Sequence, residues 1–223
     1  SGLGVLPDGR MLMATGVEEK DVPQQLAVSG FNASVIVPAT GTSNQPDATA
    51  FAPVDDYAFS ADGLSGGSRG LPATGQFTSS WDGQTVFQFG DYGADDALML
   101  GNNYTNSGTL TLVTPQSIHS LAVLASSADY SGQATVGTMV INFTNGTHSQ
   151  PFNFNAPNWF SSYSHVALAG VGRIKLGSFS IEDNGNSAPI FYQTTIPLAA
   201  LGLTQAVDSI TFTMPHQAAN TAL

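Results

Sequence analysis

Residues 138–154 read TMVINFTNGTHSQPFNF and contain the clearest fold signal in the chain. Every second residue from Met139 to Phe143 is large and apolar, so in an extended strand these side chains share one face. Asn145-Gly146 follows, and this dipeptide between two such runs is the strongest short-range signal for a β-hairpin. The stretch therefore predicts a strand over residues 138–143, a tight turn, and a return strand over residues 150–154.

Short apolar or alternating runs, bounded by Gly, Pro, Asn or Asp, recur on both sides of this hairpin. Helical periodicity is not sustained over any long stretch. The further predicted strands cover residues 26–28, 35–37, 85–89, 109–113, 118–125, 166–171, 174–181, 191–196 and 209–214. Roughly ten strands at such spacing predict an all-β fold, and more specifically a two-sheet antiparallel β-sandwich.

The first part of the chain has a different composition. Residues 1–24 contain two prolines and the adjacent charges Glu18, Glu19 and Lys20, and we interpret them as an irregular lead-in with at most one helical turn. Residues 25–223 form a single predicted β-sandwich domain, because all-β domains of this length are often undivided. Within it, residues 39–80 are rich in Gly, Ser, Ala, Pro and Asp, a composition typical of a long loop that is either functional or disordered.

Charged residues are scarce and mostly acidic. They make up 9% of the chain, yet the net charge is -11 and the pI is about 4.2. The five basic residues are Arg10, Lys20, Arg69, Arg173 and Lys175. So few scattered cations cannot neutralise a phosphate backbone, which argues against nucleic acid as a partner. The sequence has no apolar run of about 18 residues for membrane insertion and no Cys for thiol chemistry. Such a composition favours a protein that is secreted or displayed on a cell surface.

The order of several segments is recognisable. They are Ser29–Ile36, Phe89-Gly90-Asp91-Tyr92, Leu110–Pro115, Leu121–Ala125, Val140–Thr147, Asn158-Trp159-Phe160 and Phe191–Ile196. Over about residues 25–222 this order resembles the galactose-binding-domain-like β-sandwich modules of secreted bacterial proteins. The resemblance implies a jelly roll that is often a carbohydrate-binding module, often with a structural calcium ion. Asn145 and Asn158 replace two expected Asp residues, which removes two calcium carboxylates but keeps the turn geometry.

Aromatic residues beside polar loop residues are the candidate ligand contacts, because sugars stack on aromatic faces while amides and carboxylates bind their hydroxyls. The candidates are Trp81, Asp82, Tyr92, Trp159 and Tyr57. For Trp81, binding and packing are equally good interpretations. For Trp159, packing is favoured because Phe154 and Phe160 suggest the edge of the core.

Three carboxylates fall within six residues at Asp91, Asp95 and Asp96. Calcium prefers oxygen ligands from such a loop, so this segment is the candidate site for a structural calcium ion. A solvated acidic turn is the alternative interpretation.

The composition and the resemblance together favour a non-catalytic carbohydrate-binding module whose partner is a polysaccharide or glycan. One alternative is a structural or adhesive surface subunit that forms a homo-oligomer by strand pairing. Another is a jelly-roll glycoside hydrolase or polysaccharide lyase. Such an enzyme usually needs two carboxylates about 5 to 10 Å apart. Its candidates are Asp55, Asp56, Asp82 and Glu182, to none of which we assign a catalytic role.

Overall fold

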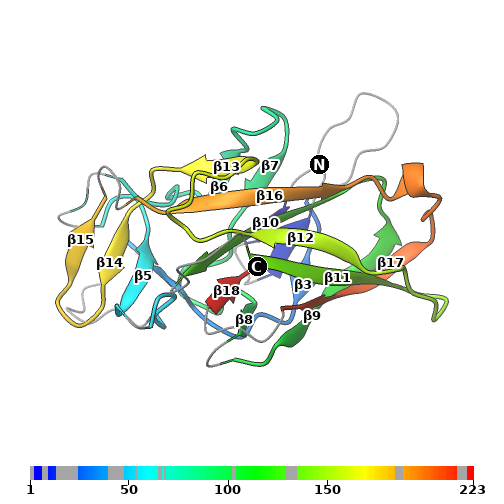
Figure 1. The fold of residues 1–223 in the computed structure, drawn as a ribbon, viewed down its shortest axis with the longest axis horizontal. Coiled ribbons are helices and arrows are strands. Elements are labelled where there is room, and N and C mark those ends of the chain that lie inside the picture. Colours follow the sequence, from blue (N-terminus) through cyan, green and yellow to red (C-terminus); the bar gives the residue numbers. More distant parts are fainter. Residues whose placement is uncertain are drawn as a thin grey trace.

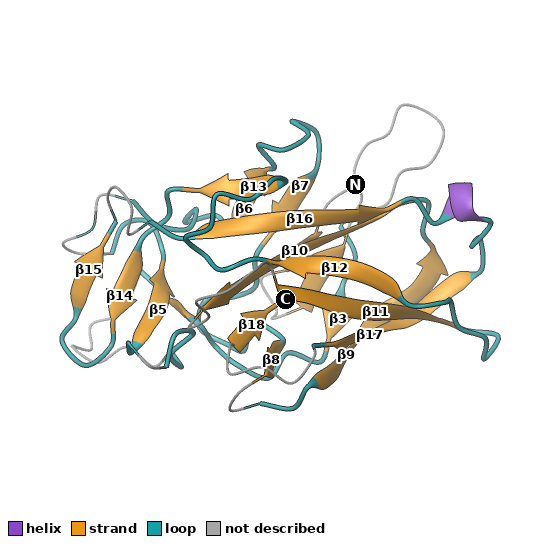
Figure 2. Ribbon diagram, viewed as in Figure 1, coloured by secondary structure: helices purple, strands orange, loops and turns teal. Residues whose placement is uncertain are grey.

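The chain folds into β-strands joined by loops and turns (Figures 1 and 2). The computed structural model describes residues 3–6, 10–13, 25–39, 48–53, 55–64, 67, 69–101, 104–128, 135–183, 188–214 and 220–223. In this part of the chain the helical structure is one 3-10 turn, η2 (Ala199–Leu201). None of the described helical structure has the length and apolar character needed to cross a bilayer. The all-β prediction is confirmed.

The larger sheet has seven strands, and all its neighbouring pairs are antiparallel. In spatial order the strands are β1 (Leu3–Leu6), β2 (Arg10–Met13), β3 (Val28–Ser29), β9 (Ser107–Ser117), β17 (Ala206–Thr213), β11 (Thr135–Phe143) and β12 (Phe152–Ala156).

The predicted hairpin is present as β11 and β12, with Met139 opposite Phe152. Its turn depends on Asn145, whose Oδ1 accepts hydrogen bonds from the backbone N–H of Thr147 (3.0 Å) and from its hydroxyl (2.7 Å). Gly146 has φ +81°, a left-handed conformation that glycine adopts without a steric penalty. The local Asn-Gly signal therefore identified the turn.

The N-terminal part differs from the prediction. Leu3–Leu6 and Arg10–Met13 form the antiparallel pair β1–β2, and β2 pairs with β3 at the edge of the large sheet. Residues 3–6 and 10–13 are therefore strands and not an irregular lead-in. Strands of four residues are too short to show a clear period-2 pattern, so pairing with the sheet decides their structure. The remainder of residues 1–24 lies outside the described residues.

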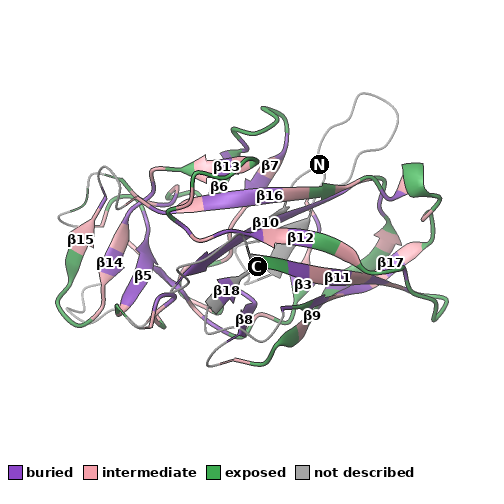
Figure 3. Cartoon of the chain, viewed as in Figure 1, coloured by how far each residue is buried: buried purple, intermediate pink, exposed green. Residues whose placement is uncertain are grey.

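The second sheet has five antiparallel strands. In order they are β13 (Val166–Ala169), β16 (Ile190–Ile196), β10 (Leu121–Ala128), β18 (Asn220–Ala222) and β8 (Met99–Gly101). Every residue of β10 is buried (Figure 3), as its continuous apolar run predicted. Inward side chains of both large sheets, such as Ile210, Phe212 and Leu121, belong to one core cluster, so the fold is a β-sandwich. Its jelly-roll connectivity stays a prediction.

Two smaller sheets extend the predicted two-sheet arrangement. The four-stranded one has the order β15 (Ser180–Glu182), β14 (Arg173–Lys175), β5 (Tyr57–Ser60) and β4 (Ile36–Val37), and its β4–β5 pair is parallel. The two-stranded one is the hairpin of β6 (Gln76–Thr78) and β7 (Val86–Gln88). Figure 1 shows β5, β14 and β15 together at one end of the molecule.

On the outer face of the large sheet, hydroxyl groups of β9 and β17 bond to one another across the strands. The hydroxyl of Thr109 lies 3.0 Å from that of Thr211, and the hydroxyl of Ser107 lies 3.0 Å from that of Thr213. On the next strand Asn142 donates from Nδ2 to Thr211 Oγ1 at 3.1 Å. These cross-strand pairs stabilise the sheet. We call this surface the hydroxyl face.

Candidate ligand-binding site

The β6–β7 hairpin presents Trp81 at its tip, and the turn that holds it is built around Asp82. Asp82 Oδ1 accepts hydrogen bonds from the backbone N–H groups of Gln84 (3.0 Å) and Thr85 (2.8 Å). Asp82 Oδ2 accepts from Thr85 Oγ1 (2.5 Å) and from Gln193 Nε2 on β16 (2.8 Å). The two oxygens thus accept two bonds each, which uses the roughly four acceptor positions of a carboxylate. Asp82 therefore positions the loop.

The turn is also attached to β13 in the neighbouring sheet. Ser80 donates its backbone N–H to the carbonyl of Ala167 at 2.8 Å. Its hydroxyl bonds to the carbonyl of Val166 at 2.9 Å. The loop is hydrogen-bonded internally through Asp82 and to β13 through Ser80. These bonds constrain its backbone in the free protein.

The side chain of Trp81 lies on the ring of His165, with centroids 3.9 Å apart and planes at 45°. Trp81 is nevertheless 49% exposed, so much of the indole remains accessible to a ligand. His165 has φ +67°, and its carbonyl accepts the backbone N–H of Gln193 at 2.9 Å. Its Nδ1 shares a hydrogen bond with the hydroxyl of Ser164 at 2.9 Å. We call Trp81 and His165 the aromatic platform.

The hydrogen bonds around Asp82 also determine its ionisation. Partial burial acts to raise the pKa of Asp82, but the bonds from Thr85, Gln84 and Gln193 outweigh it and lower the pKa to about 2. The ionised carboxylate is the form that accepts these bonds, so the turn under Trp81 needs Asp82 to be charged.

This gives a pH prediction. Because the pKa is lowered on folding, the contribution of Asp82 to stability is present above the unfolded value of 3.8 and lost as pH falls toward 2. We expect the difference in Tm between wild type and Asp82→Asn, measured by thermal unfolding, to narrow as pH is lowered through that window. A difference in Tm that does not change with pH would show that the pKa of Asp82 is the same in the folded and unfolded states.

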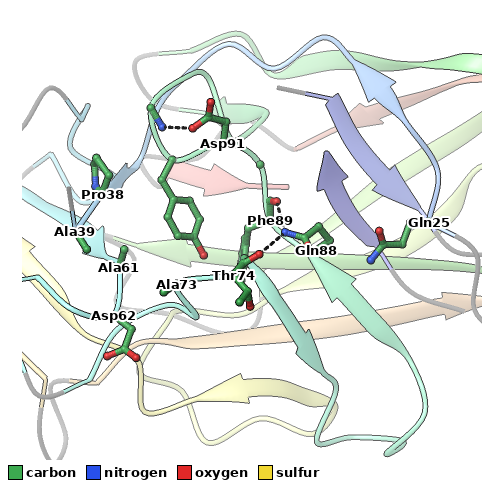
Figure 4. A pocket seen from close by; sticks show the side chains of 14 residues that line it. Gln25, Pro38, Ala39, Ala61, Asp62, Ala73, Thr74, Gln88, Phe89 and Asp91 are labelled. Atoms are coloured by element: carbon green, nitrogen blue, oxygen red, sulfur yellow. Dashed lines mark hydrogen bonds between the residues drawn. The ribbon is translucent and has the colours of Figure 1, made fainter. Parts of the chain in front are cut away.

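A pocket of about 620 Å³ lies at the open end of the same hairpin (Figure 4). Its walls include Phe89 and Tyr92, and its polar side chains include Gln88, Asp62 and Asp91. The volume is within the usual range for small-molecule sites. Three strand residues separate this pocket from the tip of the hairpin, a span of about 10 Å. The pocket and the aromatic platform are thus at opposite ends of one hairpin.

The structure locates the other ligand candidates as follows. Tyr92 lines the pocket, and its hydroxyl donates to the carbonyl of Pro72 at 2.8 Å. Trp159 is only 2% exposed and contacts Phe51 and Phe59 edge-on, with ring centroids 5.1 and 5.4 Å away. Its predicted binding role is therefore wrong for this structure, because a ring enclosed by other aromatic side chains has no face for a sugar.

Tyr57 is also buried and belongs to a polar cluster at the end of the molecule. Its hydroxyl donates to Glu182 Oε1 at 2.6 Å, and the guanidinium of Arg173 lies 3.8 Å from the centre of its ring. Arg173 in turn contacts Glu182 Oε2 at 2.6 Å. The bond to Glu182 raises the pKa of Tyr57, and the same bond lowers the pKa of Glu182, helped by Arg173. These partners hold β5, β14 and β15 together.

The acidic segment 91–96 divides into two kinds of residue. Asp91 and Asp95 are exposed, and Asp91 Oδ1 accepts the backbone N–H of Gly93 at 2.9 Å. Asp96 is 5% exposed and accepts the backbone N–H groups of Val35 (2.8 Å) and Ile36 (3.2 Å), one on each oxygen. Over the described ranges, no three His, Asp or Glu side chains form a group that could hold a metal ion. Calcium binding here stays a prediction.

The carboxylates considered for hydrolysis also have structural partners. Asp56 Oδ2 accepts the backbone N–H of Gly177 at 2.7 Å, and Asp55 is exposed beside it. Asp82 is held in its turn, and Glu182 is held by Tyr57 and Arg173. These contacts give Asp56, Asp82 and Glu182 structural roles.

Sequence reasoning missed His165, Gln88 and Asp62, which the fold brings beside Trp81 or Tyr92. A lone His or Gln in a strand-rich sequence gives no signal of its partner. Only the docking of the hairpin tip on β13 reveals the pair formed by Trp81 and His165. Comparisons of the chain with protein-family models, with curated proteins and with solved structures found no match.

Proposed function

We propose that this chain is a non-catalytic carbohydrate-binding module of a secreted or surface-displayed bacterial protein, and that it binds a neutral polysaccharide through the aromatic platform. The observation that supports the proposal most strongly is the half-exposed ring of Trp81 on a fully hydrogen-bonded turn. Sugar rings present C–H faces that pack on such an indole.

Preorganisation favours binding at this position. The hydrogen bonds from Ser80 to β13 and those accepted by Asp82 fix the loop in the free protein. A ligand then does not have to order the loop, which removes one of the main entropic costs of association. Beside the ring, the exposed residues Ser164 and His165 offer polar groups to sugar hydroxyls.

The charge of the chain favours a neutral partner. With a net charge of -11, the protein repels polyanionic glycans over distances of about 8–10 Å at moderate salt. Hydroxyl groups of a neutral polysaccharide meet no such barrier. We therefore expect binding to cellulose-, mannan- or glucan-type polymers to exceed binding to polyuronates.

The change Trp81→Ala tests the proposal. Covering 60–100 Å² of ring is worth about 1.5–2.5 kcal/mol, so we expect retention in affinity gels containing polysaccharide to weaken roughly tenfold or more. Phe179→Ala is the matched control, because Phe179 is 43% exposed but lies in the β14–β15 turn. Retention equal in wild type and Trp81→Ala, or lost in Phe179→Ala, would contradict a role for the platform.

The same samples separate the other functions. Reducing ends or unsaturated products in the supernatant would indicate a hydrolase or lyase. Gels run with and without calcium would show whether the segment containing Asp91, Asp95 and Asp96 affects binding.

The hydroxyl face supports a second candidate function, that of a self-associating surface subunit. Its paired hydroxyls on Ser107, Thr109, Thr211 and Thr213 present no charge in a chain that is otherwise strongly acidic. Two copies could approach through this face with little electrostatic repulsion. Sedimentation of the purified chain without sugar tests this: a concentration-dependent dimer or larger assembly would support it, and a monomer at all concentrations would exclude it.

A further inference from the structure

We propose that the pocket at the open end of the β6–β7 hairpin is a second binding site, and that it takes a single sugar ring bearing a protonated amine. The inference goes beyond the proposed function, because it concerns other residues than the aromatic platform and names a ligand of different charge. Two properties of the lining residues support the inference: the hydrogen-bond acceptors that remain open and the negative charge.

Three N–H and O–H donor groups of the pocket are engaged with the protein itself, while the side-chain amide of Gln25 and the hydroxyl of Thr74 donate to none of the described residues. Gln88 Nε2 donates to the carbonyls of Thr74 (2.9 Å) and Phe89 (3.1 Å), so both of its protons are used (Figure 4). The hydroxyl of Tyr92 donates to the carbonyl of Pro72 at 2.8 Å. The backbone N–H of Gly93 is bonded to Asp91 Oδ1.

Acceptor positions, by contrast, remain open. Asp91 accepts one bond on Oδ1, and Asp62 Oδ1 accepts one from the backbone N–H of Gly63 at 3.1 Å. Among the described residues, the second oxygen of each carboxylate has no hydrogen-bond donor, and neither has Gln88 Oε1. These open acceptors favour a ligand that donates hydrogen bonds. An ammonium group offers three donors and sugar hydroxyls offer one each.

The charge of the lining agrees with the hydrogen-bond pattern. The fourteen lining residues include two carboxylates, Asp62 and Asp91, and no Lys, Arg or His. Figure 4 shows Asp91 and Asp62 at two edges of the pocket, with the Asp62 carboxylate directed away from the other lining side chains. The two carboxylates attract a cationic ligand and repel a uronate.

The apolar walls and the distribution of acceptors favour a ring over a linear amine. Phe89 and Tyr92 are partly buried aromatic residues whose rings are 6.3 Å apart, and Pro38 and Ala61 add aliphatic surface. The open acceptors belong to three separate lining residues, Gln88, Asp91 and Asp62, so a ligand that bonds to more than one of them needs donors at more than one position. A sugar ring has its hydroxyl and amino groups arranged in that way, while a linear monoamine concentrates its donors at one end.

The experiment is a titration of the isotopically labelled full chain, followed by NMR, with glucosamine, glucose and glucuronate. We expect glucosamine to bind about three- to tenfold more tightly than glucose, since each of two exposed carboxylates contributes a modest attraction. Glucuronate should bind more weakly than glucose. Shifts should centre on residues 88–93, and the preference for glucosamine should decrease as salt is raised.

The variants Asp91→Asn and Asp62→Asn should each weaken glucosamine binding about threefold and leave glucose binding within about twofold, because Asn keeps an acceptor but not the charge. Asp208→Asn is the control, since it removes the same charge from β17 in the large sheet. Equal affinity for glucosamine and glucuronate, no shifts in residues 88–93, or an equal effect of Asp208→Asn would overturn the inference.

The two proposals can fail separately. If Trp81→Ala keeps full retention on polysaccharide while glucosamine still shifts residues 88–93, the platform is wrong and the pocket site stands. If retention depends on Trp81 but glucosamine gives no shifts in the pocket, the pocket site is wrong and the platform stands.

Discussion

Replacing Trp159 by Ala is expected to lower the free energy of unfolding by about 3–5 kcal/mol, the usual cost of truncating a buried Trp or Phe. The indole is 2% exposed and is enclosed by Phe51, Phe59 and Phe160, so truncation leaves a large cavity. It also removes the edge-on contacts of the ring, each worth about 0.5–1.5 kcal/mol beyond burial. Urea denaturation measures the change.

Trp81→Ala is the matched comparison. It removes the same side chain type from an exposed position and should change stability by only about 0.5 kcal/mol. We therefore expect the two variants to affect different properties. Trp159→Ala lowers stability but keeps polysaccharide retention at temperatures where it is folded. Trp81→Ala keeps stability but loses retention. If Trp159→Ala were stable but lost polysaccharide retention, the result would indicate that Trp159 binds the ligand and would contradict its structural role.

The second large effect is expected for Asp96→Ala. The carboxylate of Asp96 accepts the buried N–H groups of Val35 and Ile36, and alanine leaves both without a partner. Each buried donor without a partner costs about 1–3 kcal/mol, so for the two N–H groups we expect a loss of about 2–6 kcal/mol in unfolding free energy. Hydrogen exchange gives a local readout, because the amides of residues 35 and 36 should lose protection first.

Asp96→Asn is the control for charge, since its single side-chain oxygen still accepts one bond. Burial raises the pKa of Asp96 well above its ordinary value, against the lowering effect of the two N–H bonds. A raised pKa gives stability that is complete below the unfolded value and is lost as pH rises toward the folded value. Wild type should therefore lose stability relative to Asp96→Asn as pH increases above about 4. If EDTA instead lowered the Tm of wild type and not of the variants, Asp96 would be a calcium ligand.

The fold was predictable where the signal is local. The Asn145-Gly146 turn and the apolar run Leu121–Ala125 of β10 each specify their own structure, and both are present. The strand predicted over residues 109–113 is longer in the structure, where β9 continues through Pro115 to Ser117. The register shift between Val207 and Ser209 lies opposite this proline, and an irregular ladder tolerates the missing N–H.

The site was less predictable because it depends on contacts between distant segments. Trp81 and Asp82 were identified from local composition, but the structure gives them different roles, one exposed and one hydrogen-bonded within the turn. Asp96 resembled its acidic neighbours in the sequence. Its burial against Val35 and Ile36 depends on the approach of a segment about sixty residues earlier, as the separations of 61 and 60 positions show. Composition does not contain that information.

The hydroxyl face has a consequence for how this protein responds to its surroundings. Its paired Ser and Thr side chains carry no group that titrates in the physiological range, and each hydroxyl pair is satisfied laterally within the sheet. Acidification or salt alters the rest of the -11 surface but leaves this face chemically unchanged. The tendency of this face to associate with another surface should therefore not depend on pH or ionic strength.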